Sequence, residues 1–152
     1  MKLTPYLLLA GAFIGIGDTL FLSYYQYLNL IPSCALAGCD VVLGHELSKF
    51  FGVPWGYLGL VYYAFAAFLA FFLAVDPFSK GLRSAMLLYA TIGVACSAVF
   101  IFYIQMTLIG AICLYCAISA GTTLALFIFA LWHFLSTRSS QVDYQQSLMG
   151  RN

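Results

Sequence analysis

Residues 84–137 read SAMLLYATIGVACSAVFIFYIQMTLIGAICLYCAISAGTTLALFIFALWHFLST and contain no Asp, Glu, Lys or Arg. As one α-helix these 54 residues would measure about 81 Å, at a rise of about 1.5 Å per residue. The hydrocarbon core of a bilayer is only about 30 Å thick, so the stretch has to fold back once. It therefore predicts two membrane-spanning helices, with the reversal near residues 105–110.

Three shorter uncharged stretches precede it. A spanning helix needs about 20 apolar residues, so residues 50–75 fit one crossing, and the N-terminal segment fits another that carries Asp18 midway. We therefore predict four helices, at about residues 5–28, 55–75, 83–105 and 111–134. The predicted fold class is all-α, an integral membrane four-helix bundle over residues 1–135. A polar cytoplasmic tail over residues 136–152 follows it, and we expect this tail to fray.

The composition supports the membrane assignment and excludes other classes. Of the 152 residues, 64% are hydrophobic and only 7% are charged, against about 25% charged residues in an average soluble domain. Six basic and five acidic residues are too few to cover a soluble globule, and such hydrophobicity excludes disorder. The scattered basic residues form no phosphate-neutralising patch, so we expect no nucleic-acid partner.

The basic residues also predict the orientation in the membrane. An even number of crossings leaves both termini on one side, and one basic residue, Lys49, falls on the other side. The basic residues on the terminal side are Lys2, Lys80, Arg83, Arg138 and Arg151. The positive-inside rule then predicts cytoplasmic N and C termini, with the loop 29–54 and the turn 106–110 outside.

The cysteines are the features that point to chemistry. Cys34 and Cys39 lie in the predicted outer loop, and Cys113 and Cys116 lie where the fourth helix leaves the outer surface. An i, i+3 pair lies on one helix face, and the positive end of the helix dipole lowers the pKa of a cysteine near the N-terminus. This helix pair and the loop pair on the same oxidising face together predict a dithiol relay. Because disulfide exchange is reversible, such a relay needs an electron sink.

Other readings of the same cysteines remain open at this point. Four cysteines can form two inert structural disulfides, or a four-thiolate zinc site in a non-catalytic membrane module. We favour neither, because a four-helix membrane bundle hardly needs structural disulfides to stabilise it, and in an oxidising compartment disulfide formation competes with zinc binding by thiolates. We therefore expect no metal. Cys96 falls mid-membrane in the third helix, where we expect a buried cysteine that acts as a small hydrophobic residue.

Taken in order, the motifs resemble the short bacterial members of the vitamin K epoxide reductase family. The resemblance covers about residues 5–134. It rests on Cys34-x4-Cys39, Asp40-Val41-Val42-Leu43, Phe51-Gly52-Val53-Pro54 leading into Gly56 and Gly59, and Cys113-Leu-Tyr-Cys116. The other quinone-coupled disulfide-forming membrane enzymes carry Cys-x-x-Cys in the first outer loop, which argues against them.

The resemblance implies a mechanism as well as a fold. In such proteins Cys34 would exchange with a thioredoxin-fold (DsbA-like) partner, Cys39 would pass electrons to Cys113, and Cys116 would face a quinone, either ubiquinone or menaquinone. The family often carries a fused thioredoxin-like domain. This sequence has none, so the resemblance implies a separate partner in the outer compartment.

Five residues are candidate quinone contacts. Phe51, Trp55, Tyr62 and Tyr63 supply aromatic surface, although aromatic residues at a membrane interface are also common anchors. Six residues after the second loop cysteine, where the family commonly has Ser or Thr, stands His45, with Ser48 three residues further on. We expect His45 either to donate a hydrogen bond or shuttle a proton, or to be a solvent-exposed loop residue. Vertebrate members have a Tyr where Ala120 stands here.

Among the polar residues inside the predicted helices are Asp18, Gln105 and His133, and the sequence leaves the roles of the first two open. An ionised carboxylate at mid-bilayer costs roughly 2.5–3.5 kcal/mol, so Asp18 should face the bundle interior. It is either a structural clasp with Thr19 and Ser23 or part of a proton relay. Gln105, just before the Cys-x-x-Cys turn, is similarly ambiguous, and we expect His133 to be an anchor at the inner interface.

The residues and the resemblance together predict a multi-pass thiol oxidase of the cytoplasmic (inner) membrane, with its active site on the extracytoplasmic face. It would reoxidise a thioredoxin-fold disulfide donor and reduce a membrane quinone. The alternatives are a quinone or quinone-epoxide reductase whose product is the reduced quinone, and the non-catalytic module described above.

Overall fold

Four long helices form the body of the protein in a computed structural model that describes residues 3–30, 32 and 38–149, with side chains up to Thr137. They are α1 (Thr4–Tyr27), α3 (Trp55–Val75), α4 (Lys80–Ala98), which the π-helix η2 (Val99–Ile109) continues, and α5 (Leu114–Met149). Each is long and apolar enough to cross a membrane. The predicted all-α membrane four-helix bundle is therefore confirmed.

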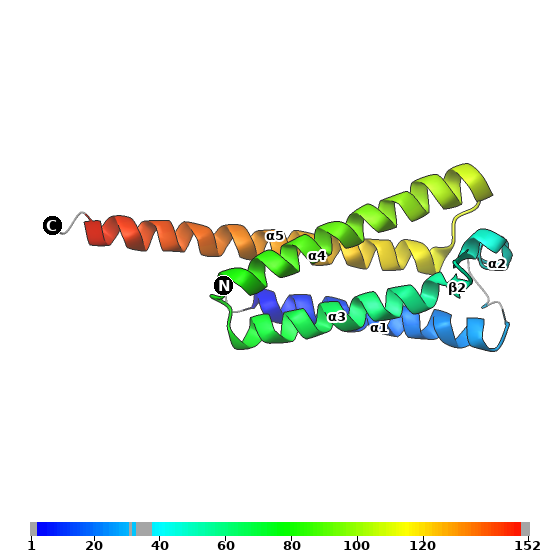
Figure 1. Cartoon of the computed structure of the whole chain (residues 1–152), viewed down its shortest axis with the longest axis horizontal. Helices are drawn as coiled ribbons and strands as arrows, with labels where there is room; N and C mark the ends of the chain where they lie inside the picture. The colour runs from blue at the N-terminus through cyan, green and yellow to red at the C-terminus, as the bar shows by residue number, and fades with distance from the viewer. Residues whose placement is uncertain (1–2, 31, 33–37, 150–152) are drawn as a thin grey trace.

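The described part of the segment between α1 and α3 forms a small cap at one end of this bundle. It contains α2 (Cys39–Gly44), the short 3₁₀ turn η1 (Glu46–Ser48), and a hairpin of β1 (Lys49–Phe50) and β2 (Val53–Pro54). In Figure 1 the cap lies at the right-hand end, where α1 ends and α5 begins. The start of α1 and the far end of α5 lie away from it, toward the opposite end of the bundle.

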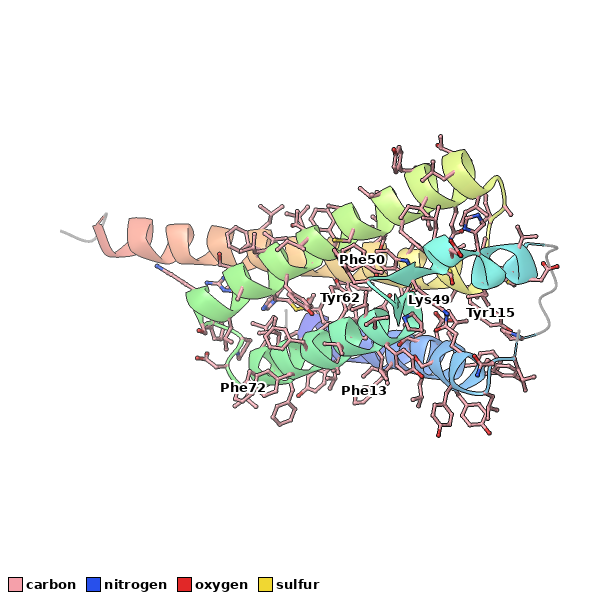
Figure 2. All side chains as sticks on the ribbon, turned by 45° about the vertical axis from the view of Figure 1, so that its right-hand side comes forward. Phe13, Lys49, Phe50, Tyr62, Phe72 and Tyr115 are labelled. Atoms are coloured by element: carbon pink, nitrogen blue, oxygen red, sulfur yellow. The ribbon has the colours of Figure 1, made fainter. Side chains whose placement is uncertain are left out.

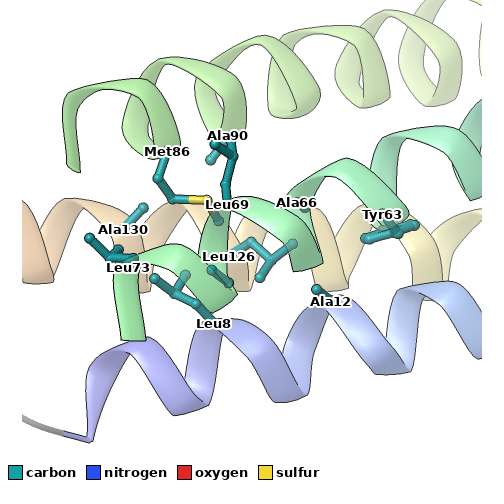
Figure 3. Packing of buried hydrophobic residues seen from close by; sticks show 11 residues of the cluster. Leu8, Ala12, Tyr63, Ala66, Leu69, Leu73, Met86, Ala90, Leu126 and Ala130 are labelled. Carbon is teal, nitrogen blue, oxygen red and sulfur yellow. The ribbon is translucent and has the colours of Figure 1, made fainter. Parts of the chain in front are cut away.

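Small side chains let the helices approach closely in the core of the bundle. Ala12, Ala66, Ala90 and Ala130 are all buried there, and Figure 3 shows them among Leu, Met and Tyr side chains of the core. Within a membrane such small residues favour close packing, because lipid offers apolar side chains no hydrophobic gain. Large apolar residues such as Phe13 instead project outward, 60% exposed, where lipid would cover them (Figure 2).

Two helix ends differ from the sequence-based expectation. The third crossing starts at Lys80 and runs to Ile109, because η2 adds a π-helical segment before the reversal at Gly110, whose φ is 74°. The helix of the fourth crossing, α5, continues beyond the candidate span to Met149, so the tail that we expected to fray is helical over most of its length. Helix-compatible residues fill this segment, and its first Gly after the crossing is Gly150.

Candidate active site

Cys39 and Cys113 meet beneath the cap. They are 74 positions apart in the sequence, yet their Sγ atoms are 3.4 Å apart, with the Cys113 thiol donating to the Cys39 sulfur. Both side chains are buried. Cys39 is disulfide-bonded, whereas Cys113 and Cys116 are free thiols. Cys34 lies outside the described residues.

The approach of α2 to the start of α5 depends on Gly38. A Cβ atom at this position would lie only 2.5 Å from the Ile112 carbonyl oxygen, so a larger residue would push the two segments apart. Cys39, Val42 and Cys113 then form one buried apolar cluster with neighbouring side chains around it. The cap therefore shields the Cys39–Cys113 contact from water.

Gln105 holds Cys113 in position. Its Oε1 accepts a hydrogen bond of 3.1 Å from the backbone N–H of Cys113, and its side chain is fully buried. Its carbonyl oxygen accepts from the N–H groups of Gly110 and Ala111, at 2.8 and 3.2 Å, which closes the π-helix and starts the reversal. The sequence signal for this role was a lone amide in an apolar run, which left the function of Gln105 open.

Cys113 is the thiol that the site activates. A hydrogen bond from Cys116, helped by the backbone N–H groups of Cys116 and Tyr115, lowers the pKa of the Cys113 thiol to about 7 against the opposing effect of burial. Cys113 directly precedes α5, so these N–H groups belong to the unpaired first turn of that helix. At neutral pH a large share of Cys113 is therefore thiolate, the reactive form.

This shift predicts an acidic titration step in the reduced protein. As the pH rises through about 7, we expect Cys113 to lose its proton, whereas an ordinary cysteine does so near pH 8.5. The measurement is the ultraviolet absorbance of the thiolate against pH. The same titration of Cys113→Ser should lack this step, and a first step at pH 8.5 or above in the parent protein would contradict the geometry.

A cavity of about 650 Å³ opens beside Cys116. Side chains from α1, α3, α4, η2 and α5 form its largely apolar wall, and Phe50 of β1 contributes at the cap end. Trp55 packs between the cap and η2, because its ring contacts Phe50 of β1 and Phe100 of η2. Its Nε1 donates a hydrogen bond to the Leu47 carbonyl in the cap. Figure 2 labels three of the lining aromatics, Phe50, Tyr62 and Tyr115.

Three of the five candidate quinone contacts, Trp55, Tyr62 and Tyr63, line this cavity. Phe51 does not, since it lies at the hairpin tip with 92% of its surface exposed, and Phe50 occupies the wall instead. His45 is also absent from the wall: it is exposed, and its Nδ1 accepts from the Leu47 N–H at 3.1 Å, which caps η1.

Two expectations about other side chains are wrong. Cys96 is exposed rather than buried, and it lines the cavity. His133 is not an interfacial anchor but a buried residue, 3% exposed, where α5 packs against the rest of the bundle. Ala120 also lines the cavity.

The predicted clasp around Asp18 does not form. Thr19 donates its hydroxyl to the Gly15 carbonyl at 2.7 Å instead, and Ser23 Oγ has no hydrogen-bond partner in the described part of the chain. Asp18 itself lines the cavity, and its Oδ2 is buried without a partner there. Among the residues that the structure describes, no group of three or more His, Cys, Asp or Glu side chains is arranged to hold a metal ion.

Comparison with known proteins gives two matches. The sequence profile of the vitamin K epoxide reductase family matches residues 6–131. The protein named thiol-disulfide oxidoreductase LTO1, from Arabidopsis thaliana, is 28% identical over 140 residues, which cover 88% of this chain and 36% of that protein. The chain thus spans little more than a third of the length of this relative.

Proposed function

The chain belongs to the vitamin K epoxide reductase family and has four helices suited to crossing a membrane, and from these premises we propose that it is a quinone-coupled thiol oxidase. It takes electrons from a thioredoxin-fold protein outside the cytoplasm and passes them to a membrane quinone. One observation carries this proposal. Cys39 and Cys113 are in sulfur-to-sulfur contact at 3.4 Å, and Cys116, one helical turn further, lines a cavity of about 650 Å³.

The relay begins with the partner. We propose Cys34 as the disulfide partner of Cys39, since two cysteines share the outer loop and Cys39 is disulfide-bonded. A thiolate of the partner attacks Cys34, and Cys39 leaves as a thiolate. The partner's second thiolate then displaces Cys34, so the partner leaves as a disulfide and the loop pair is reduced.

The second exchange moves the electrons to the helix pair. The Cys39 thiolate attacks Cys113 in the Cys113–Cys116 disulfide, and Cys116 leaves as a thiolate. Cys34 then attacks Cys39, which restores the loop disulfide and releases Cys113. The described state, with Cys39 oxidised and Cys113 and Cys116 free, corresponds to the end of this step.

The cavity has the properties that a quinone requires. Its volume falls within the range of about 300–1,000 Å³ that is typical of small-molecule sites, and aromatic side chains are prominent in its wall. Asp18 Oδ2 and Tyr62 Oη are buried polar atoms without partners in the described residues, so they are available to the oxygens of a bound molecule. A quinone bound there would accept two electrons and two protons. Trp55 and Tyr62 would hold its ring.

The relay also requires a redox partner that supplies the electrons. The Arabidopsis relative is named a thiol-disulfide oxidoreductase, and family membership implies a redox partner in general. We propose a separate thioredoxin-fold protein because such proteins carry an exposed dithiol that exchanges with loop disulfides.

A thiol count tests the proposed function. The fully reduced protein in lipid nanodiscs is freed of reductant and mixed, without air, with a short-chain quinone. We expect two free thiols to disappear for each quinone reduced, first from Cys113 and Cys116, as mapped by alkylation and mass spectrometry. An unchanged thiol count in the presence of quinone would overturn the proposal, and stoichiometric zinc in the purified protein would favour the non-catalytic module.

The orientation gives a further prediction, because five of the six basic residues lie on one predicted side. In a background without native cysteines, Asp40→Cys should react with an impermeant thiol reagent in intact cells, because position 40 is exposed on α2. Lys80→Cys, which is exposed at the opposite end of the bundle, should react only after the cells are opened. The reverse pattern would place the active site in the cytoplasm.

A further inference from the structure

Asp18 is the one acidic residue among the described side chains that line the cavity, and no Lys or Arg is among them. Its Oδ2 is buried and makes no hydrogen bond within the described residues. A carboxyl group in this position has no counter-ion that holds it in the ionised form, so it can carry a proton.

A structural role does not explain this carboxyl group. The neighbours that would clasp it are engaged elsewhere or lack contact with it, as Thr19 bonds to Gly15 and Ser23 Oγ has no partner. A buried polar atom without a partner is costly, and such exceptions are common at functional sites. The cavity that Asp18 faces is the same one that Cys116 lines.

We propose that Asp18 is the proton carrier of the site: it takes the proton of the Cys116 thiol and delivers it to an oxygen of the molecule reduced in the cavity. This inference rests on the proposed function, because a quinone is the molecule that would receive the proton. It adds a catalytic residue to the four cysteines.

The chemistry balances with one carboxyl group in this role. Oxidation of the Cys113 and Cys116 thiols forms one S–S bond and releases two electrons and two protons. Reduction of a quinone to a hydroquinone consumes two electrons and two protons. Asp18 gains a proton at Oδ2 and loses it again, so it is unchanged after each turnover. The second proton balances through the bulk solvent: Cys113 has given one up when it becomes a thiolate, and the reduced quinone takes one up.

The other titratable groups around the cavity fit this role less well. Tyr63 is held by Ser119 and Thr123, since its hydroxyl lies 2.6 Å from the Ser119 carbonyl and 2.8 Å from Thr123 Oγ1. Tyr62 Oη has no partner but lies against Gly93, and phenols release protons less readily than carboxyl groups. The remaining titratable lining residues are Cys96 and Tyr115.

Asp18→Asn tests the inference, because asparagine preserves the shape of the side chain but cannot relay a proton. Asp76→Asn is the matched control: Asp76 is exposed in the α3–α4 turn, and the one described hydrogen bond of its side chain, from the Phe78 N–H, can be kept by asparagine. Both variants are compared with the parent protein in nanodiscs, with a short-chain quinone as the probe.

Three measurements separate the possible roles. Quinone affinity is read from quenching of Trp55 fluorescence in a Trp132→Phe background. Disulfide exchange is read from reduction of the Cys113–Cys116 bond by dithiothreitol without quinone. Proton delivery is read from the single-turnover rate of hydroquinone formation against pH and in heavy water. For Asp18→Asn we expect affinity and exchange within about twofold of the parent, and hydroquinone formation about 100-fold slower, the usual scale for losing a general acid or base.

Each alternative result has a distinct meaning. If Asp18→Asn forms hydroquinone as fast as Asp76→Asn, the inference is wrong while the proposed function stands. If its quinone affinity falls as much as its rate, Asp18 is a binding contact and not a proton carrier. A fall in dithiothreitol exchange would instead assign it a structural role. If the parent protein itself forms no hydroquinone, the proposed function fails and the inference fails with it.

Discussion

Cys116→Ser should abolish quinone-dependent thiol oxidation and trap a Cys39–Cys113 disulfide. Cys113 and Cys39 are in contact at 3.4 Å, so the remaining Cys113 thiolate can attack Cys39 and release Cys34 as a free thiol. Without Cys116 no thiol on α5 can resolve this bond, and the one reverse route, attack by the freed Cys34, is blocked by alkylating free thiols before the variant is mapped. We expect turnover to fall by at least about 1000-fold, as when the reacting group of other enzymes is removed. Peptide mapping of the non-reduced variant should find Cys39 linked to Cys113.

The same variant should also capture the partner. Its free Cys34 thiol can attack the disulfide of an oxidised thioredoxin-fold protein, which leaves a mixed disulfide at Cys34. Cys96→Ser is the matched control, since Cys96 lines the same cavity but lies outside the relay, and it should trap neither bond. A Cys34–Cys113 bond would reverse the roles of the loop cysteines. Absence of any bond between the two pairs would favour structural disulfides.

The number of crossings could be predicted from the sequence because the cause is local. Charges are so costly inside a bilayer that uncharged stretches mark the spanning helices, and residues 55–75 were assigned with the bounds that α3 has. The all-α bundle follows from the same argument. The π-helical end of the third crossing could not be predicted, because it depends on hydrogen bonds around the Gln105 carbonyl that no residue pattern marks.

The site was predictable only in part for a different reason. Residue types and motif order selected the four cysteines, and the fold brings Cys39 to Cys113. The cavity wall depends on how α3 and α4 separate toward the cap, which is a tertiary property. Hence Phe50 lines the cavity where Phe51 was expected, and Cys96 is exposed although it lies in the middle of an apolar helix.

Replacing Cys34, the loop cysteine that we propose meets the partner, should separate exchange with the partner from reduction of the quinone. In Cys34→Ser the partner loses the sulfur that it attacks, so we expect oxidation of the thioredoxin-fold protein to fall by at least about 100-fold. Cys39 keeps its thiol and its contact with Cys113, so it can still attack the Cys113–Cys116 disulfide. A small dithiol such as dithiothreitol can then resolve the Cys39–Cys113 bond by attacking Cys39.

Quinone reduction driven by dithiothreitol should therefore stay within about threefold of the parent in Cys34→Ser, a change of less than about 1 kcal/mol in the barrier. Cys39→Ser provides the contrast: it removes the sulfur that contacts Cys113, so the exchange that reduces the Cys113–Cys116 disulfide is lost and both activities should fall together. The two assays on the two variants thus distinguish a disulfide relay from inert structural disulfides. If Cys34→Ser lost its dithiothreitol activity as completely as Cys39→Ser, Cys34 would belong to the inner exchange, and its assignment as the residue that meets the partner would be wrong.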